Sequence, residues 1–185
     1  MPLLGATFYF SKSPRFIPPP IIKAKLFSIL LLTIILPILL FFLLKTLRKV
    51  NSIHLKTTKE RILPLGLSCI ITIIIVQRVL PYSELIELYC FFIGILLSTM
   101  ACLMLAVLKF KASIHMIGSA GVLMFFIAIS IHFSININIS IAVFCIIIGA
   151  IASSRLHLKA HSNVELIIGF FVGLIPQIIM LNYWL

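Results

Sequence analysis

Three side chains near the C-terminus have the types and the spacing that nucleophilic attack on phosphorus requires. Arg155, His161 and Glu165 lie close together in a chain with only four acidic residues. If this stretch is helical, His161 and Glu165 share one face at i and i+4, and the carboxylate can fix the tautomer of the imidazole. A neighbouring guanidinium can hold a phosphoryl group while the imidazole attacks it. The pattern predicts a nucleophile, His161, an orienting carboxylate, Glu165, and a phosphate-binding group, Arg155.

A second histidine, His115, can supply the remaining step of such a reaction. A departing alkoxide needs a proton, and an imidazole on the opposite side of the phosphorus can donate it. Lys111 and Ser113 lie beside His115 in the sequence and can donate to the non-bridging oxygens. Arg61 is a candidate for a further cationic contact. This scheme needs no metal and no other cofactor, so we expect none.

The chain that must position these residues is very apolar. Hydrophobic residues make up 62% of its 185 residues, charged residues make up 10%, and the mean hydropathy is +1.27. These values lie far outside the range of soluble domains and indicate an integral membrane protein. The net charge of +11 would suggest nucleic acid in a soluble protein. In a membrane protein it serves topology, anionic headgroups or an anionic substrate, so we expect a membrane and a lipid phosphate as partners and no nucleic acid.

Six apolar stretches are long enough to cross a bilayer, and all should be helices because an open strand would leave its backbone unpaired in hydrocarbon. They are Leu26–Leu44, Ile62–Leu80, Leu88–Leu108, Ile117–Phe133, Ile135–Ala152 and Leu166–Leu185. The predicted fold is therefore an all-α, six-helix membrane bundle over residues 26–185, after an N-terminal interfacial segment, residues 1–25. The loops after the first, third and fifth helices then share one face of the membrane, which receives the candidate site.

The candidate residues resemble motifs of the type 2 phosphatidic acid phosphatase superfamily, six-helix membrane phosphatases related to vanadium haloperoxidases. The third motif of that family is Ser-Arg, five residues, His, three residues, Asp. Here it reads Ser154-Arg155, His161 and Glu165. The resemblance implies that the histidine forms a phosphohistidine, that the carboxylate orients it, and that Ser154 and Arg155 bind phosphate.

The other two motifs of the family are less complete in this chain. The second motif, Pro-Ser-Gly-His, is matched by residues 112–115, which keep only Ser113 and His115. The resemblance implies that His115 is the general acid. The first motif, Lys, six residues, Arg-Pro, is not intact. Lys59 with Arg61, or Lys109 with Lys111, can stand in for it, and we favour Arg61 and Lys111.

The membrane orientation is open to two interpretations. Ten of the 15 Lys and Arg residues fall on the face that carries the motifs, which the positive-inside rule would make cytoplasmic. Without four bases that can serve the substrate, the count is six against five, and the preference disappears. These four are Arg61, Lys111, Arg155 and Lys159. Similar bacterial phosphatases commonly act on the outer face of the inner membrane, so the resemblance implies a bacterial inner-membrane protein with a periplasmic site.

Other interpretations of the same residues remain open. The degenerate motifs also suit a non-catalytic, phosphatase-like subunit of a membrane protein complex. His157, His161 and Glu165, at i, i+4 and i+8, could be three metal ligands on one helix, although Arg155 and Lys159 would repel a cation. The stretch could also be a plain basic interfacial loop with incidental histidines. A transporter or channel fits less well, because ionisable residues are scarce inside the spans.

Overall fold

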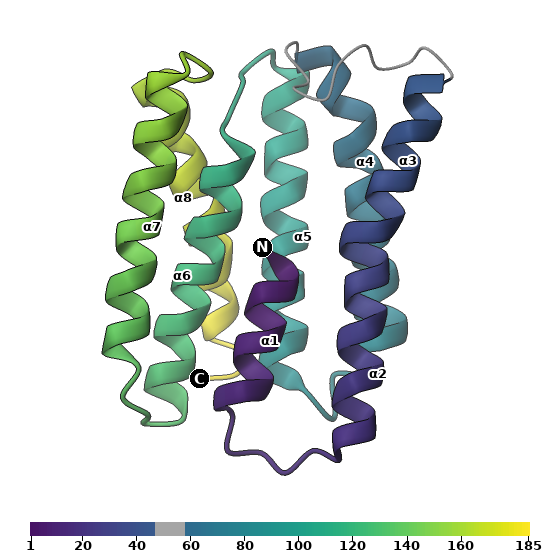
Figure 1. Ribbon diagram of the computed structural model, residues 1–185, viewed down its shortest axis with the longest axis vertical. Coiled ribbons are helices and arrows are strands. Elements are labelled where there is room, and N and C mark those ends of the chain that lie inside the picture. Colours follow the sequence, from purple (N-terminus) through teal and green to yellow (C-terminus); the bar gives the residue numbers. More distant parts are fainter. Residues whose placement is uncertain (47–57) are drawn as a thin grey trace.

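The computed structural model describes residues 1–46 and 58–185, without the side chain of Lys59, which therefore lies outside the described part of the chain. All regular structure in these ranges is helical. Six of the helical segments are long and apolar enough to span a membrane, which confirms the predicted all-α, six-helix bundle (Figure 1). The chain is a multi-pass membrane protein.

The helices begin and end close to the limits that hydropathy predicts. The first span, Pro19–Thr46, joins α2 (Pro19–Leu30), a π-helical turn η1 (Leu31–Ile35) and α3 (Leu36–Thr46). Pro37 has no N–H to donate and crowds the preceding turn, so the wider π turn directly before it is a suitable place for this residue. The other spanning helices are α4 (Thr58–Ile74) with the π turn η2 (Ile75–Val79), α5 (Ile86–Val107), α6 (Ile114–His132), α7 (Asn138–His157) and α8 (Asn163–Leu181).

Helix α6 lies at the centre of the bundle and is the most buried of the spans, whereas the first span and α7 are the least buried. Phe125 of α6 stacks on Phe91 of α5 with a centroid separation of 4.1 Å. Large apolar side chains on the peripheral helices, such as Leu39 and Ile146, are exposed. Exposed apolar surface of this kind is expected where a helix faces lipid.

Helix α8 packs very closely on α6 because two of its positions have no side chain. A Cβ added at Gly169 would lie 3.0 Å from the carbonyl oxygen of Ser113, and one added at Gly173 would overlap the backbone of Ile117. Small residues four apart allow this kind of approach between membrane helices. The two glycines therefore set the distance between α6 and α8.

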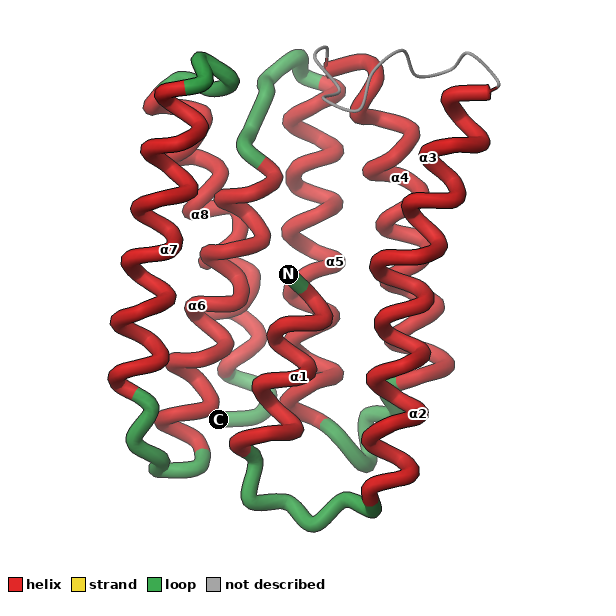
Figure 2. Tube along the Cα trace, viewed as in Figure 1, coloured by secondary structure: helices red, strands yellow, loops and turns green. Residues whose placement is uncertain are grey.

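The connections divide between the two ends of the bundle. Loops 108–113 and 158–162 lie together at the upper end in Figure 1, and loops 80–85 and 133–137 lie at the lower end (Figure 2). Residues 1–25 contain α1 (Pro2–Lys12) and the start of α2. Helix α1 packs on α5 and α6 and runs from the lower end to about mid-height of the bundle. Its Ala6 and Tyr9 are fully buried.

We predict that Gly173→Ala destabilises the protein by about 1–3 kcal/mol, because the added methyl group must push α6 and α8 apart. The measurement is the midpoint of thermal unfolding of the purified protein in detergent. Gly149→Ala on α7 is the matched control, since a Cβ there meets nothing within 4 Å. It should be neutral or stabilising by up to about 1 kcal/mol through helix propensity. Equal midpoints for the two variants would contradict the close packing.

Candidate functional site

The N-termini of α6 and α8 are joined at the upper end of the bundle. Ser113 is the N-cap of α6, and its backbone N–H donates to the carbonyl oxygen of Glu165, in the first turn of α8, at 3.2 Å. The first N–H groups of a helix have no partner within that helix, and they carry its positive dipole end. Two helix starts held together in this way form a favourable environment for an anion.

The predicted pair of His161 and Glu165 is in contact: Nδ1 of His161 lies 2.7 Å from Oε2 of Glu165. The contact does not depend on one helix across both residues, because the condition that this stretch is helical is not met at His161. Helix α7 ends at His157, and Lys159 adopts the left-handed φ of 49° that stops it. The N–H of Ala160 then closes the turn on the carbonyl of Arg155. His161 therefore lies in a turn, one residue before the N-cap of α8.

Helix capping brings the carboxylate of Glu165 to His161. The backbone N–H of Glu165 donates to Oγ of Ser162 at 3.3 Å, and the N–H of Ser162 donates to Oε2 of Glu165 at 3.2 Å. This reciprocal pair is a capping box. The same Oε2 accepts from Nδ1–H of His161, which places the proton on Nδ1 and leaves the lone pair on Nε2.

His161 is well suited to remain neutral at neutral pH. Its side chain is 6% exposed. Burial lowers the pKa of His161, although the hydrogen bond and the charge of Glu165 act in the opposite direction. Because the net direction is downward from the ordinary value near 6.5, the Nε2 lone pair is available above that pH.

Arg155 and His115 form the second contact of the site. Nη2 of Arg155 lies 3.1 Å from Nε2 of His115 and can only donate, so this imidazole accepts at Nε2 and holds its proton on Nδ1. His161 and Arg61 are electrostatic neighbours of His115 as well. The third-motif arginine and the second-motif histidine are thus brought together from α7 and α6. An anion that attracts the guanidinium would release Nε2 of His115.

Lys111 and Arg61 border the same site, and each holds a backbone carbonyl there. Nζ of Lys111 donates to the carbonyl of Ala160 at 3.1 Å, and Nη1 of Arg61 donates to the carbonyl of Ala112 at 3.0 Å. Arg61 is buried. The two cations therefore position the segments before His161 and Ser113 and add positive charge around them. Their role as direct phosphate ligands stays a prediction.

The two serines of the motifs differ in environment. Ser113 is fully buried, and its hydroxyl has no hydrogen-bond partner among the described residues. A buried hydroxyl without a partner is costly, so it is a group available to a ligand. Ser154 is exposed on the last turn of α7, and within the described ranges no side-chain hydrogen bond holds it. The structure does not bring Ser154 into the cluster.

The alternative metal site is not supported by the backbone. His157 ends α7, and Glu165 belongs to α8, so His157, His161 and Glu165 do not lie on one helix face. Among residues 1–46 and 58–185, no group of three or more potential ligands is placed to hold a metal ion. His157 is exposed and separate from the pair that His161 makes with Glu165.

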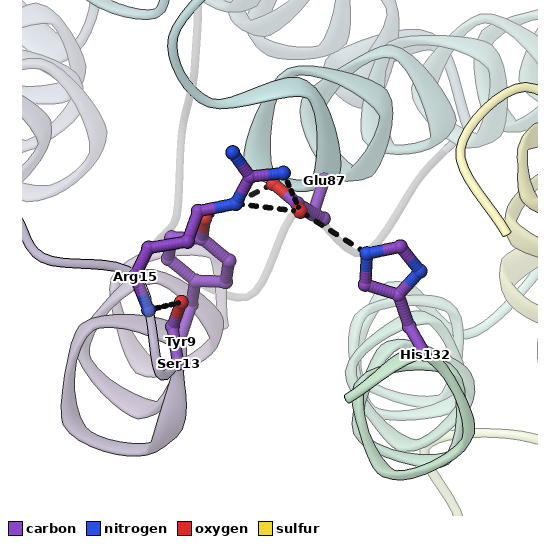
Figure 3. A network of polar contacts seen from close by, with 5 residues as sticks. All are labelled: Tyr9, Ser13, Arg15, Glu87 and His132. Atoms are coloured by element: carbon purple, nitrogen blue, oxygen red, sulfur yellow. Dashed lines mark hydrogen bonds and ion pairs between the residues drawn. The ribbon is translucent and has the colours of Figure 1, made fainter. Parts of the chain in front are cut away.

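A second polar cluster, which sequence reasoning missed, surrounds Glu87 near the lower end of the bundle (Figure 3). Glu87 is fully buried at the start of α5. Arg15 contacts its Oε1 at 2.6 Å, His132 contacts the same oxygen at 3.3 Å, and Tyr9 donates to Oε2 at 3.0 Å. Figure 3 shows Arg15 and His132 approaching the carboxylate from opposite sides.

This cluster fastens α1 to the bundle, since Tyr9 and Arg15 come from the N-terminal segment while Glu87 and His132 come from α5 and α6. A signal for it was present in the sequence. Glu87 is one of four acidic residues and begins an apolar span, where an ionisable group must find partners. Six crossings also place the N-terminal segment and the loop before the third span on one face of the membrane, which brings Arg15 and Glu87 to the same end of the bundle.

We predict that Glu87→Gln lowers the free energy of unfolding by about 1–3 kcal/mol, because the buried contacts lose their charge. It should also speed tryptic cleavage after Arg15, because that side chain loses its carboxylate partner. The matched control is Glu84→Gln. Glu84 has a 63% exposed side chain and a single 3.5 Å ion pair with Lys25, so its effect should be under about 1 kcal/mol. Unchanged stability and cleavage in Glu87→Gln would contradict the fastening role.

Comparison with known proteins adds no relative to this picture. No protein-family model, no curated protein and no solved structure matches the chain. The resemblance to the phosphatase superfamily therefore stays an expectation from the sequence motifs alone, that is, from Ser154, Arg155, His161 and Glu165, with Ser113 and His115.

Proposed function

We propose that this chain is an integral membrane phosphatase that hydrolyses a lipid phosphate or pyrophosphate through a phosphohistidine intermediate. The observation that carries the proposal is the contact between Nδ1 of His161 and Oε2 of Glu165, which leaves Nε2 of a buried imidazole with its lone pair. The cations around it and the two joined helix starts suit an anionic substrate.

The reaction then proceeds in two steps. Nε2 of His161 attacks the terminal phosphorus, the P–N bond forms, and the P–O bond to the leaving group breaks. The leaving group is the lipid alkoxide of a phosphate or the lipid monophosphate of a pyrophosphate. Arg155 moves from His115 to the transferred phosphoryl group, and the negative charge of that group favours a protonated His115, which donates to the departing oxygen. In the second step His115 takes a proton from water, the water oxygen attacks phosphorus, and the P–N bond breaks. Inorganic phosphate and free His161 are the products.

The proposal includes a location. A phosphate headgroup reaches the site at the upper end of the bundle, where loops 108–113 and 158–162 meet. We propose that this end is the periplasmic face of a bacterial inner membrane. The basic groups of the site itself account for much of the charge that would otherwise mark this face as cytoplasmic.

A second function, that of a non-catalytic phosphatase-like subunit in a membrane complex, is favoured by one specific observation. Arg61 and Lys111, the candidates for the first motif, both donate to backbone carbonyls, those of Ala112 and Ala160. In this arrangement they stabilise the loops. Activity measurements separate the two functions directly.

We predict that His161→Ala lowers phosphate release by at least about a thousandfold, because the nucleophile is lost. The assay measures inorganic phosphate released by purified protein from a panel of lipid phosphates and pyrophosphates. His157→Ala is the matched control, since His157 is exposed and outside the cluster, and it should retain wild-type rates. Equal release from wild type and His161→Ala would refute the mechanism. No release by wild type from any substrate in the panel would favour the subunit.

The pH dependence should have an acid limb set by His161. Its lowered pKa means that the neutral, nucleophilic form persists to below about pH 6.5, so kcat/KM should fall only as the pH drops through that lower value. Glu165 raises the pKa of His161, so Glu165→Gln should move the limb to still lower pH and also reduce kcat. Using one substrate for all variants cancels the ionisation of the substrate itself. If the acid limb of kcat/KM shifts to higher pH, or does not shift, in Glu165→Gln, the proposed role of the pair of His161 and Glu165 is contradicted.

A further inference from the structure

A cavity of about 380 Å³, partly open to the outside, lies among the helices next to the candidate site. His115 borders it, and its walls come from the first span, α4, α5 and α6, with Met1 and Pro2 of the N-terminal segment. Gln177 of α8 also lines it. The cavity therefore extends from His115, the proposed general acid, between the apolar side chains of the helices.

The lining of this cavity suits an apolar ligand. Most of the surface is apolar, and the hydroxyl groups on the wall already donate to carbonyl oxygens of their own helices. Examples are Thr33 to Ile29, Thr72 to Ser68 and Thr99 to Ile95, at 2.7–2.8 Å. The lining contains no Lys or Arg among the residues that the structure describes. Apart from the α-amino group of Met1, which lies near His115, a phosphate would find no cation at this wall, and the apolar remainder of the wall suits a hydrocarbon chain.

The position of the cavity relative to His115 indicates which part of a substrate it holds. Attack by His161 must occur opposite the departing oxygen, and His115 protonates that oxygen. The group attached to the departing oxygen therefore lies on the side of His115, where the cavity begins. This step rests on the proposed function.

We infer that the cavity binds the hydrocarbon chain of the leaving group and that the preferred substrate is the phosphate or pyrophosphate of a single-chain alcohol. A volume of about 380 Å³ lies near the lower end of the range of ligand pockets, about 300–1,000 Å³. It suits one chain, and a lipid with two chains would have to leave the second outside. Moving a chain from lipid into a protein cavity involves no hydrophobic gain, so the selectivity comes from packing and from alignment of the reacting phosphate.

The test uses dodecyl phosphate that carries a diazirine at the chain end, photolysed with the purified full-length protein in nanodiscs. Labelled residues are mapped by mass spectrometry. Labels should fall on cavity-lining positions of α4, α5 or α6. Filling the cavity by Thr99→Phe should reduce this labelling by about tenfold, equivalent to about 1.4 kcal/mol of binding free energy. Met100→Phe on the same helix is the matched control, because Met100 is exposed and does not line the cavity, and it should label as wild type does.

A second cavity-filling variant, a competition assay and a variant without the nucleophile complete the experiment. Ser68→Phe fills the cavity from α4 and replaces Thr99→Phe if that variant does not fold. Unlabelled dodecyl phosphate should compete with the probe, and a two-chain phosphatidic acid should compete at least tenfold less well, about 1.4 kcal/mol. Labelling needs no turnover, so it should persist in His161→Ala. Cavity labelling without phosphate release from any substrate would therefore refute the phosphatase alone. Labels only on lipid-facing positions, unchanged labelling in both filled variants, or equal competition by the two-chain lipid would overturn the inference.

Discussion

The close contact between α6 and α8 is the constraint on which the rest of the upper end depends. Gly169 and Gly173 remove the side chains that would hold the helices apart, and the N–H of Ser113 reaches the carbonyl of Glu165 across the gap. This one hydrogen bond fixes two helix starts relative to each other. His115 lies in the first turn of α6, and Glu165, the partner of His161, lies in the first turn of α8. The geometry of the polar cluster therefore follows from the packing of the two helix backbones.

The two polar clusters of the bundle differ in how completely their groups are satisfied. Around Glu87, both carboxylate oxygens have partners, which come from the N-terminal segment and from α6. At the upper end, the Ser113 hydroxyl has no partner in the described part of the chain, and Nε2 of His161 retains its lone pair. A saturated cluster stabilises a fold, whereas one with spare donors and acceptors can bind something else. This difference is the basis for proposing that the Glu87 cluster stabilises the fold and that the upper cluster carries out the reaction.

The sequence predicted the six spans well, because run length in hydrocarbon leaves little choice of structure. It also predicted the pairing of His161 with Glu165. It ended the fifth span at Ala152, whereas α7 continues to His157, because apolar run length does not show how far a helix extends into its polar loop. The left-handed residue that follows this helix is Lys159, not a glycine that the sequence would have signalled. The Glu87 cluster was missed because its members are far apart in sequence and meet only when α1 folds into the bundle. Arg61 and Lys111 were identified as cations near the site, but which oxygens they contact depends on loop conformation that spacing does not determine.

Oε2 of Glu165 starts a helix and orients an imidazole at the same time. Because one oxygen atom has both roles, the reactivity of His161 depends on when α8 forms during membrane insertion. Helix α8 follows all the other spans in the sequence and emerges from the ribosome after them. Until α8 has inserted and its first turn has closed, no carboxylate fixes the tautomer of His161, and a partly assembled chain exposes no competent nucleophile. An enzyme built in this way would acquire its chemistry only after α8 has joined the other five spans in the membrane.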